Sequence, residues 1–388
     1  MASTYLTRTF SGAGNRKTWT MSAWIKRSGL KASSEDRVFG WKSGGGNYGF
    51  QFDNDAFNFY VCSGGSNAQF KTNRLFRDVN AWYHIVASCD TTQSTQSDRF
   101  KLYINGVQET SFATETYPNQ DEDTAINQAE VCRLGCSTVA ENSHFSGLMS
   151  HVYFIDGTAY GADTFGSTDS TTGEWKINTS PSITMGTNGF TVLKDGNTIT
   201  DQSSNSNDFT LGGGTLTNTE DCPSNVFATF NPLHNTSATM SNGNLTAQST
   251  NSNYISGVST LGTKTGKFYA EFKLIAEGAS GESVIGVTAL VRPTSAIVGQ
   301  TGNFGIRNNS GLNYYTSGGT AYTGTSQHDN FTVNDIIGVA LDMDNGRVYF
   351  SKNGGWWNGA STWTGTSPST YVTLQTDIYD EFFFECGD

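Results

Sequence analysis

Residues 334–354 read Asn-Asp-Ile-Ile-Gly-Val-Ala-Leu-Asp-Met-Asp-Asn-Gly-Arg-Val-Tyr-Phe-Ser-Lys-Asn-Gly, and this stretch decides the fold. It predicts a strand over 336–342, a turn at Asn345-Gly346 and a second strand over 347–352 that ends at Asn353-Gly354. Asn-Gly between two apolar runs is a strong hairpin signal, because both residues tolerate the positive φ angles that such turns require. The stretch therefore predicts antiparallel β-structure.

Alternation of apolar and polar residues extends this prediction to other parts of the chain. Residues 19–26 and 268–274 both alternate, as expected for strands with one face on a core and one in solvent. The inward positions are Trp19, Met21, Ala23 and Ile25 in the first run, and Phe268, Ala270, Phe272 and Leu274 in the second. Lys267, Tyr269, Glu271 and Lys273 are expected to face outward.

The composition fits an all-β chain and excludes two kinds of partner. Among 388 residues, 44 are Gly and only 15% are charged, which suits short strands joined by many turns. The net charge is −12 and basic residues occur as isolated pairs, so we expect no nucleic-acid binding. No apolar run has the length of a membrane span, and the N-terminus lacks the apolar core of a signal peptide. The six cysteines are irregularly spaced and are expected to be reduced.

The length predicts two or three domains. We expect two antiparallel, jelly-roll-like β-sandwiches in series, at 1–165 and 233–388, with a Thr-, Asn- and Gly-rich connector at 166–232. The connector contains Phe190 and Phe209 among other apolar residues, which favours packing on the first sandwich. The alternative is a disordered linker. We expect the boundary at the Asn-Pro pair 231–232.

Four segments of the first part, taken in order, resemble the laminin-G-like, concanavalin-type jelly roll. They are 19–26, 82–86, 101–107 and 145–157, and each reads as a strand with an apolar face that ends at a Gly or Asn turn. The resemblance implies a two-sheet sandwich over about 5–165.

The last part resembles a SPRY domain, another two-sheet sandwich. Its carriers are 266–272, 285–287, 334–342 and 346–354. The two domains with a connector between them resemble virion proteins of marine tailed phages, including cyanophages.

This resemblance implies a structural or recognition role on a phage particle. We expect a non-enzymatic tail-fibre or capsid-surface subunit, assembled in the host cytoplasm and exposed on the virion surface. Its expected partners are other virion proteins and a host-surface polysaccharide or protein. We also expect a homo-oligomer, with a trimer as the first guess, since linked copies raise effective concentration. The alternatives are a secreted-type lectin or adhesin and a glycan-degrading enzyme.

Aromatic residues in polar segments are the candidate ligand-binding residues, since such rings can stack on sugar faces or anchor a partner. Trp356, Trp357 and Trp363 follow the Asn-Gly turn at 353–354, while Tyr314 and Tyr315 follow a run of Asn, Ser and Gly. The structural alternative is that one tryptophan of the pair lies under its own sandwich.

Catalytic and metal-binding patterns are weak, so no catalytic residue, metal site or cofactor is assigned. The acidic run 121–123 is expected in a solvated loop, because contiguous acids alternate faces and cannot converge on a sugar bond. Asp53, Asp55 and Asp156 could supply oxygen ligands to calcium at a sandwich rim, although no spacing identifies a site. The five histidines show no metal spacing and no nucleophile partner.

The C-terminal segment 382–384 reads as an apolar core strand. A SPRY-like sandwich is expected to continue past this point, so the domain is predicted to be incomplete at its C-terminus. We expect this strand to lack a ladder partner on one side, because either the natural chain is longer or a neighbouring subunit supplies a strand.

Overall fold

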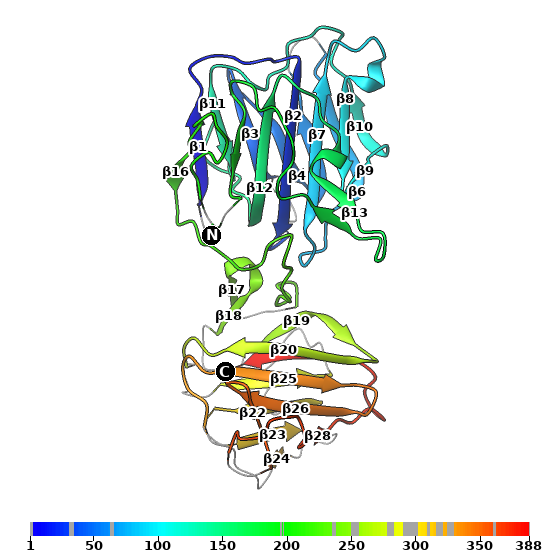
Figure 1. Ribbon diagram of the computed structural model, residues 1–388, viewed down its shortest axis with the longest axis vertical. Coiled ribbons are helices and arrows are strands. Elements are labelled where there is room, and N and C mark those ends of the chain that lie inside the picture. The colour runs from blue at the N-terminus through cyan, green and yellow to red at the C-terminus, as the bar shows by residue number, and fades with distance from the viewer. Residues whose placement is uncertain are drawn as a thin grey trace. The chain divides into compact units, whose positions relative to one another are not determined.

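The chain divides into two compact units, Met1–Phe227 and Ala228–Asp388 (Figure 1). The computed structural model describes residues 3–30, 35–62, 66–194, 196, 198–234, 238–249, 256–277, 283–289, 302–308, 311–315, 321–323, 330–359 and 362–387. Within these ranges the helices are three short 3-10 turns, η1 (Gln96–Asp98), η2 (Ala162–Thr164) and η3 (Asn242–Asn244). None of them has the length and apolarity needed to cross a membrane.

In its described part, the first unit contains two large antiparallel sheets that form a sandwich. The eight-stranded sheet runs in the order β10 (Phe112–Thr116), β6 (Gln69–Leu75), β5 (Ala56–Tyr60), β4 (Gly46–Asp53), β3 (Glu35–Ser43), β11 (Val131–Leu134), β1 (Tyr5–Thr9), β16 (Thr210–Gly213). The six-stranded sheet runs β15 (Phe190–Val192), β12 (Gly147–Asp156), β2 (Thr18–Arg27), β7 (Tyr83–Asp90), β8 (Phe100–Ile104), β9 (Val107–Gln108).

The core of the first unit is rich in aromatic rings, and the period of two in its strands produces it. On β2, Trp19, Met21 and Ile25 are essentially without exposure and face the opposite sheet, as their alternation predicts. Phe39 and Trp41 on β3 reach the same core, where the rings of Trp41 and Phe154 lie 5.1 Å apart. The predicted sandwich of the first part is therefore confirmed.

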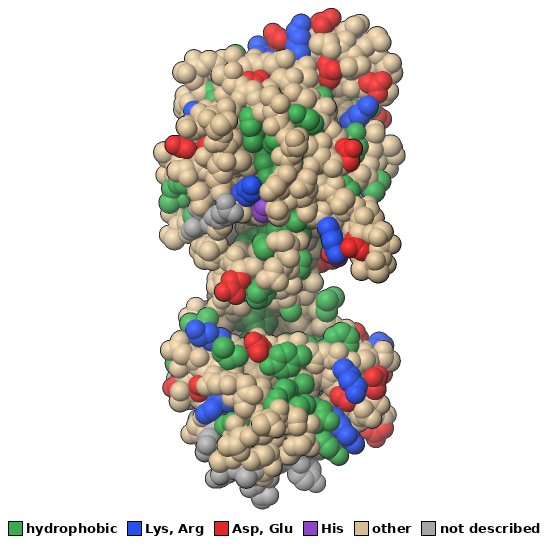
Figure 2. All heavy atoms as spheres, in the orientation of Figure 1, with side chains coloured by type: hydrophobic (Ala, Val, Ile, Leu, Met, Phe, Trp, Pro, Cys, Tyr) green, Lys and Arg blue, Asp and Glu red, His purple; other side chains and the backbone are tan. Residues whose placement is uncertain are grey.

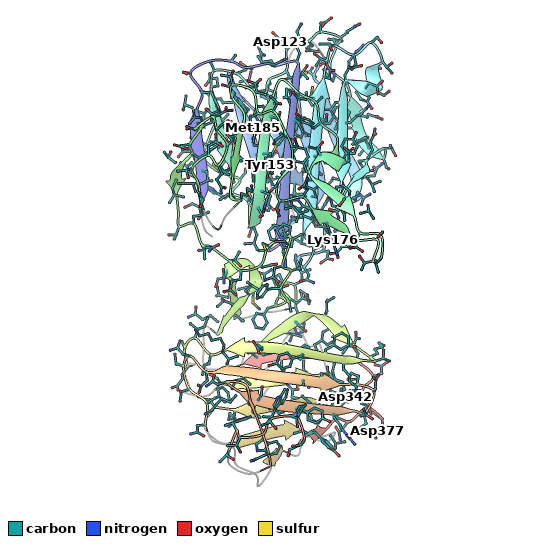
Figure 3. All side chains as sticks on the ribbon, in the orientation of Figure 1. Asp123, Tyr153, Lys176, Met185, Asp342 and Asp377 are labelled. Carbon is teal, nitrogen blue, oxygen red and sulfur yellow. The ribbon has the colours of Figure 1, made fainter. Side chains whose placement is uncertain are left out.

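Segments after residue 165 add strands to both sheets of the first unit. Strand β15 pairs with β12, and β16 pairs with β1. Phe190 and Phe209 are buried in the core of this unit. The hairpin of β13 (Gly166–Thr168) and β14 (Trp175–Ile177) lies on a second apolar cluster with Tyr153 and Phe165 (Figure 3). These contacts account for the apolar islands in an otherwise polar stretch.

The second unit also contains two antiparallel sheets in its described part. Its six-stranded sheet runs β19 (Ser256–Thr263), β29 (Phe382–Gly387), β21 (Val284–Thr288), β22 (Asn303–Arg307), β23 (Gly311–Tyr315), β24 (Ala321–Thr323). The other sheet runs β20 (Lys267–Lys273), β25 (Ile336–Asp342), β26 (Arg347–Lys352), β27 (Gly355–Trp356), with β28 (Val372–Thr373) also paired to β26. A small hairpin joins β17 (Ala238–Ser241) to β18 (Thr246–Ser249).

The predicted hairpin at Asn345-Gly346 is confirmed. Strands β25 and β26 pair in register from Ile337 opposite Lys352 to Asp342 opposite Arg347. Gly346 has a φ of 62°, in the left-handed region where glycine carries no steric penalty.

The expectation of an unpaired C-terminal strand is wrong. Strand β29 pairs with β19 on one side and with β21 on the other, so both of its edges are occupied within this chain. Val258 and Gly286 lie on either side of Glu385 in this ladder. The two explanations offered for a missing partner therefore lose their basis. Sequence reasoning failed here because β19 is polar and lies more than 100 residues before the strand it covers.

Candidate functional site

The outer surface of the five-stranded sheet in the second unit carries an unusual set of side chains. On β25, Ile337, Val339 and Leu341 are almost fully buried and face the core. The intervening residues, Gly338 and Ala340, must therefore point to the outer surface. Both are small, so this strand forms a low floor between its neighbours.

Aromatic rings stand on both sides of this floor. Strand pairing places Tyr269 of β20 and Tyr349 of β26 opposite each other across Ala340. Trp356 of β27 lies beside Ser351 of β26, and Tyr371 precedes β28. We call the group of Tyr269, Tyr349, Trp356 and Tyr371 the aromatic face. Figure 2 shows apolar side chains gathered over the area where Figure 1 places β20, β25 and β26.

The rings of the aromatic face contact one another in two pairs. The ring centroids of Tyr269 and Trp356 lie 6.1 Å apart, and those of Tyr349 and Tyr371 lie 5.6 Å apart in an edge-on arrangement. Tyr269 is 52% exposed and Tyr371 is 40% exposed, so both present ring surface to solvent. Rings held by neighbours lose little side-chain entropy when a ligand stacks on them.

Polar groups lie among the rings. The Tyr269 hydroxyl donates a hydrogen bond to Glu271 Oε1 at 2.8 Å. Partial burial, together with this hydrogen bond, raises the pKa of Tyr269. A Cβ at Gly338 would collide with the Tyr269 hydroxyl and with Ser351, so glycine allows the tyrosine to lean across β25. The surface thus combines stacking area with donors and acceptors.

One edge of this surface is charged. Asp342, at the end of β25, accepts hydrogen bonds from the backbone and side chain of Asn345 and lies 3.2 Å from Lys267 Nζ (Figure 3). It therefore closes the hairpin turn, and both of its oxygens are already engaged. The guanidinium of Arg347 lies over the ring of Tyr371, with Cζ 4.1 Å from the ring centroid.

The structure separates the three predicted tryptophans. Trp356 lies on the aromatic face. Trp357 is 5% exposed and belongs to the core, and its backbone N–H donates to the Phe350 carbonyl. Its assignment as a ligand-binding residue is therefore wrong, because adjacent residues at a strand end point to opposite faces. Trp363 is half-buried and packs against the same core.

The two predicted tyrosines do not belong to a loop. Tyr314 and Tyr315 lie in β23, where Tyr314 pairs with Phe304 and Tyr322. The positions of both side chains fall outside the described part of the structure.

The sequence did not lead us to assign the three tyrosines of the aromatic face as ligand-binding residues, although it contained a signal for them. Tyr269 was expected to face outward, and Tyr349 stands between the buried Val348 and Phe350. An outward-facing tyrosine on a strand was therefore visible at each position. The pairing that brings positions 269, 349 and 371 to one surface was not.

The two adjacent tryptophans allow a direct check of these placements. We expect Trp357→Ala to lower the free energy of unfolding of the second unit by about 3–5 kcal/mol, since it empties a large core site. We expect Trp356→Ala to cost less than about 1 kcal/mol, as for a surface residue. Chemical unfolding of the full chain, followed by tyrosine and tryptophan fluorescence, measures both. Equal losses would contradict the assignment of the two rings to opposite faces.

His84 in the first unit resembles a catalytic base but is not arranged as one. Its Nε2 lies 2.9 Å from Ser22 Oγ, and Trp175 Nε1–H donates to its Nδ1 at 3.0 Å. Nδ1 must then be unprotonated, so Nε2 carries the proton and donates it to Ser22. Burial lowers the pKa of His84 to about 3. A base that already donates to the hydroxyl cannot activate it, so this contact is structural.

The acidic run 121–123 lies in a loop, as predicted. Glu122 accepts backbone hydrogen bonds from Asn119 and Ser66, at 2.7 and 3.3 Å. Asp121 and Asp123 are exposed. The run therefore closes turns and offers no pair of converging carboxylates.

The three aspartates considered for calcium do not come together. Asp53 Oδ2 lies 2.6 Å from Lys71 Nζ, and both oxygens of Asp55 are paired with arginines. Asp156 accepts hydrogen bonds from backbone and side-chain amides. Within the described ranges no group of three or more His, Cys, Asp or Glu side chains is placed to hold a metal ion.

The fold and the site define the class of this protein: it is an all-β protein of two antiparallel sandwiches, and the second has an aromatic outer surface. Residues 2–163 match the laminin-G-like model of the concanavalin A-like lectin/glucanases superfamily, and residues 267–369 match the SPRY domain. The chain therefore carries a laminin-G-like, concanavalin-type domain followed by a SPRY domain. No curated protein matches the chain.

Solved structures with a similar fold come from several sources. The SPRY domain of human HERC1 is 20% identical, covers 41% of this chain and 88% of its own, and has a TM-score of 0.32. Domains LG4-5 of the mouse laminin alpha1 chain are 9% identical, cover 98% of this chain and 78% of their own, and have a TM-score of 0.30. The enzymatically active domain of bacteriophage CBA120 tailspike protein 2 is 14% identical, covers 41% of this chain and 25% of its own, and has a TM-score of 0.27.

Proposed function

We propose that this chain is a non-enzymatic recognition protein whose second unit binds polysaccharide through the aromatic face. The observation that carries the proposal is the pair of rings formed by the half-exposed Tyr269 and the partly buried Trp356, with the Glu271 carboxylate hydrogen-bonded to the Tyr269 hydroxyl. Sugar rings present apolar C–H faces and a rim of hydroxyl groups. A surface that offers aromatic area and a carboxylate side by side suits both features.

The aromatic face has the form of an open platform. A platform can accept an internal segment of a long chain, whereas a closed pocket accepts a chain end or a small molecule. The small side chain of Ala340 lies between Tyr269 and Tyr349, so it does not project between the two rings. We therefore propose a polymeric ligand.

We further propose that the chain is a virion surface subunit of a tailed phage. It would be part of a tail fibre or of the capsid surface and be present in several copies. What supports this placement is the series of a laminin-G-like domain, a polar connector and a SPRY domain. Antibody labelling of purified particles by electron microscopy tests it. Label on cell debris in place of particles would point to a lectin or adhesin of cellular origin.

Binding to polysaccharide extracted from the host envelope tests the recognition proposal. We expect Trp356→Ala and Tyr269→Ala each to weaken binding by about tenfold or more, because truncation of an aromatic anchor at a binding surface costs about 2 kcal/mol or more. Val107→Ala, at a side chain of the first unit that is 66% exposed, serves as the control and should leave binding unchanged. Biolayer interferometry with immobilised polysaccharide gives the affinities.

Two outcomes would contradict the proposal. If both variants bound as tightly as the original chain, the ligand would lie elsewhere. If incubation of the polysaccharide with the protein released reducing ends, the protein would be an enzyme, in line with the glucanases that share the fold of the first domain.

A further inference from the structure

We propose that the polysaccharide bound at the aromatic face is anionic, and that Arg347 binds its acidic group. This inference rests on the proposed function and adds the class of ligand.

Strand pairing places Arg347 in the row next to the tyrosines. It lies between Asp342 on β25 and Thr373 on β28, one pair away from Tyr349 on the same strand. Tyr349 and Arg347 have the same parity on β26, so both side chains rise from the outer surface. The cation is therefore part of the surface that carries the rings.

The guanidinium lies over a ring. Its Cζ lies 4.1 Å from the centroid of Tyr371, and Tyr371 in turn meets Tyr349 edge-on. A stacked guanidinium uses its π surface for the ring and keeps its N–H donors in the plane. A hydrogen bond with Tyr349 raises the pKa of Arg347, so it remains charged. The fork of donors is thus oriented before a ligand arrives.

The carboxylate opposite Arg347 in the ladder, Asp342, acts on Arg347 through its charge but forms its ion pair with another residue. Asp342 lies 3.2 Å from Lys267 Nζ and accepts two hydrogen bonds from Asn345. Among the ion pairs of the described residues, none joins Arg347 to an acid within 4.0 Å. Lys264 of the same unit differs, since it lies 2.8 Å from Asp380.

Arg347 lies over Tyr371 at the edge of the aromatic face. In this position its guanidinium can bind a planar anionic group of a ligand that stacks on the rings. A carboxylate matches the guanidinium fork in two parallel hydrogen bonds, and a sulfate ester matches it nearly as well. Uronic acid sugars supply the first group, and sulfated sugars supply the second. The overall charge of −12 would repel such polymers, so binding requires a local cation.

Three purified polymers separate the possibilities: polygalacturonate, dextran sulfate and neutral dextran, each measured with the full chain at physiological salt. We expect at least one anionic polymer to bind about tenfold or more tightly than dextran. Tighter binding of polygalacturonate would identify a carboxylate as the anionic group, and tighter binding of dextran sulfate would identify a sulfate ester. Arg347→Gln should remove this preference, and Arg347→Lys should restore little of it, because an ammonium lacks the planar fork.

Lys273→Gln is the control, since it removes one exposed cation at the end of β20 opposite to Lys267 and Arg347. An equal loss in Lys273→Gln and Arg347→Gln would show diffuse attraction and overturn the inference. If dextran bound as tightly as the anionic polymers and Arg347→Gln had no effect on binding, the inference of an anionic ligand would be wrong. The proposed function would still hold in that case if Trp356→Ala weakened binding. If none of the three polymers bound, and if Trp356→Ala also left the affinity for the host polysaccharide unchanged, the proposed function itself would be wrong.

Discussion

Asp221→Asn is expected to lower the free energy of unfolding of the first unit by about 3–5 kcal/mol. Asp221 Oδ2 lies 2.7 Å from Lys26 Nζ, and neither side chain has appreciable exposure. Its Oδ1 accepts hydrogen bonds from Trp82 Nε1 at 3.0 Å and from the Phe227 backbone at 3.2 Å. Asparagine keeps an acceptor for the last two donors but leaves the lysine charge buried and unpaired.

The exposed pair of Lys176 and Asp169 provides the control for this prediction. Its atoms are as close, at 2.8 Å, but Lys176 is half exposed (Figure 3). Water screens such a pair, so Asp169→Asn should cost at most about 1 kcal/mol. Urea unfolding of both variants gives the comparison. Similar losses would mean that Asp221 does not hold the end of the connector on the first unit.

Glu385→Gln is expected to remove a strong pH dependence from the second unit. Burial raises the pKa of Glu385 from 4.5 to about 8, and one donor, Asn303 Nδ2 at 2.9 Å, does not offset this. The folded state therefore keeps its proton up to about pH 8, while the unfolded state releases it above about pH 4.5. Stability falls as pH rises through this window, by at most about 5 kcal/mol in total, and then levels off.

Unfolding midpoints of the second unit at about pH 5, pH 7 and pH 9 measure the effect. The original chain should lose stability along this series, whereas Glu385→Gln should lose little, since glutamine stays neutral and still accepts from Asn303. Asp377→Asn, at an exposed carboxylate of the same unit, is the control (Figure 3). A flat profile for the original chain would show that Glu385 is not buried as described.

Much of the fold was visible in the sequence, because strands with one buried face alternate. Trp19, Met21 and Ile25 reach the predicted core, and the Asn345-Gly346 turn joins the predicted strands. Alternation reports which way a side chain points along one strand. It does not report which strands become neighbours, so the two-sided pairing of β29 was missed.

The candidate site was predictable only in part, for the same reason. Trp356 was named, but so was Trp357, because a two-residue strand carries no alternation to tell them apart. Tyr269, Tyr349 and Tyr371 come together through pairings that span about 100 residues of chain. The ion pair of Lys26 with Asp221 joins positions 195 residues apart, and no local sequence pattern predicts it.

Hydroxyl-radical footprinting of the full chain, with and without saturating host polysaccharide, tests the central claim most directly. Exposed aromatic rings react with hydroxyl radicals, and a bound ligand shields them. The account predicts that Tyr269, Tyr371 and Trp356 lose reactivity on binding, while Tyr103 in the first unit does not change. Shielding confined to the first unit, with the aromatic face as reactive as before, would contradict it.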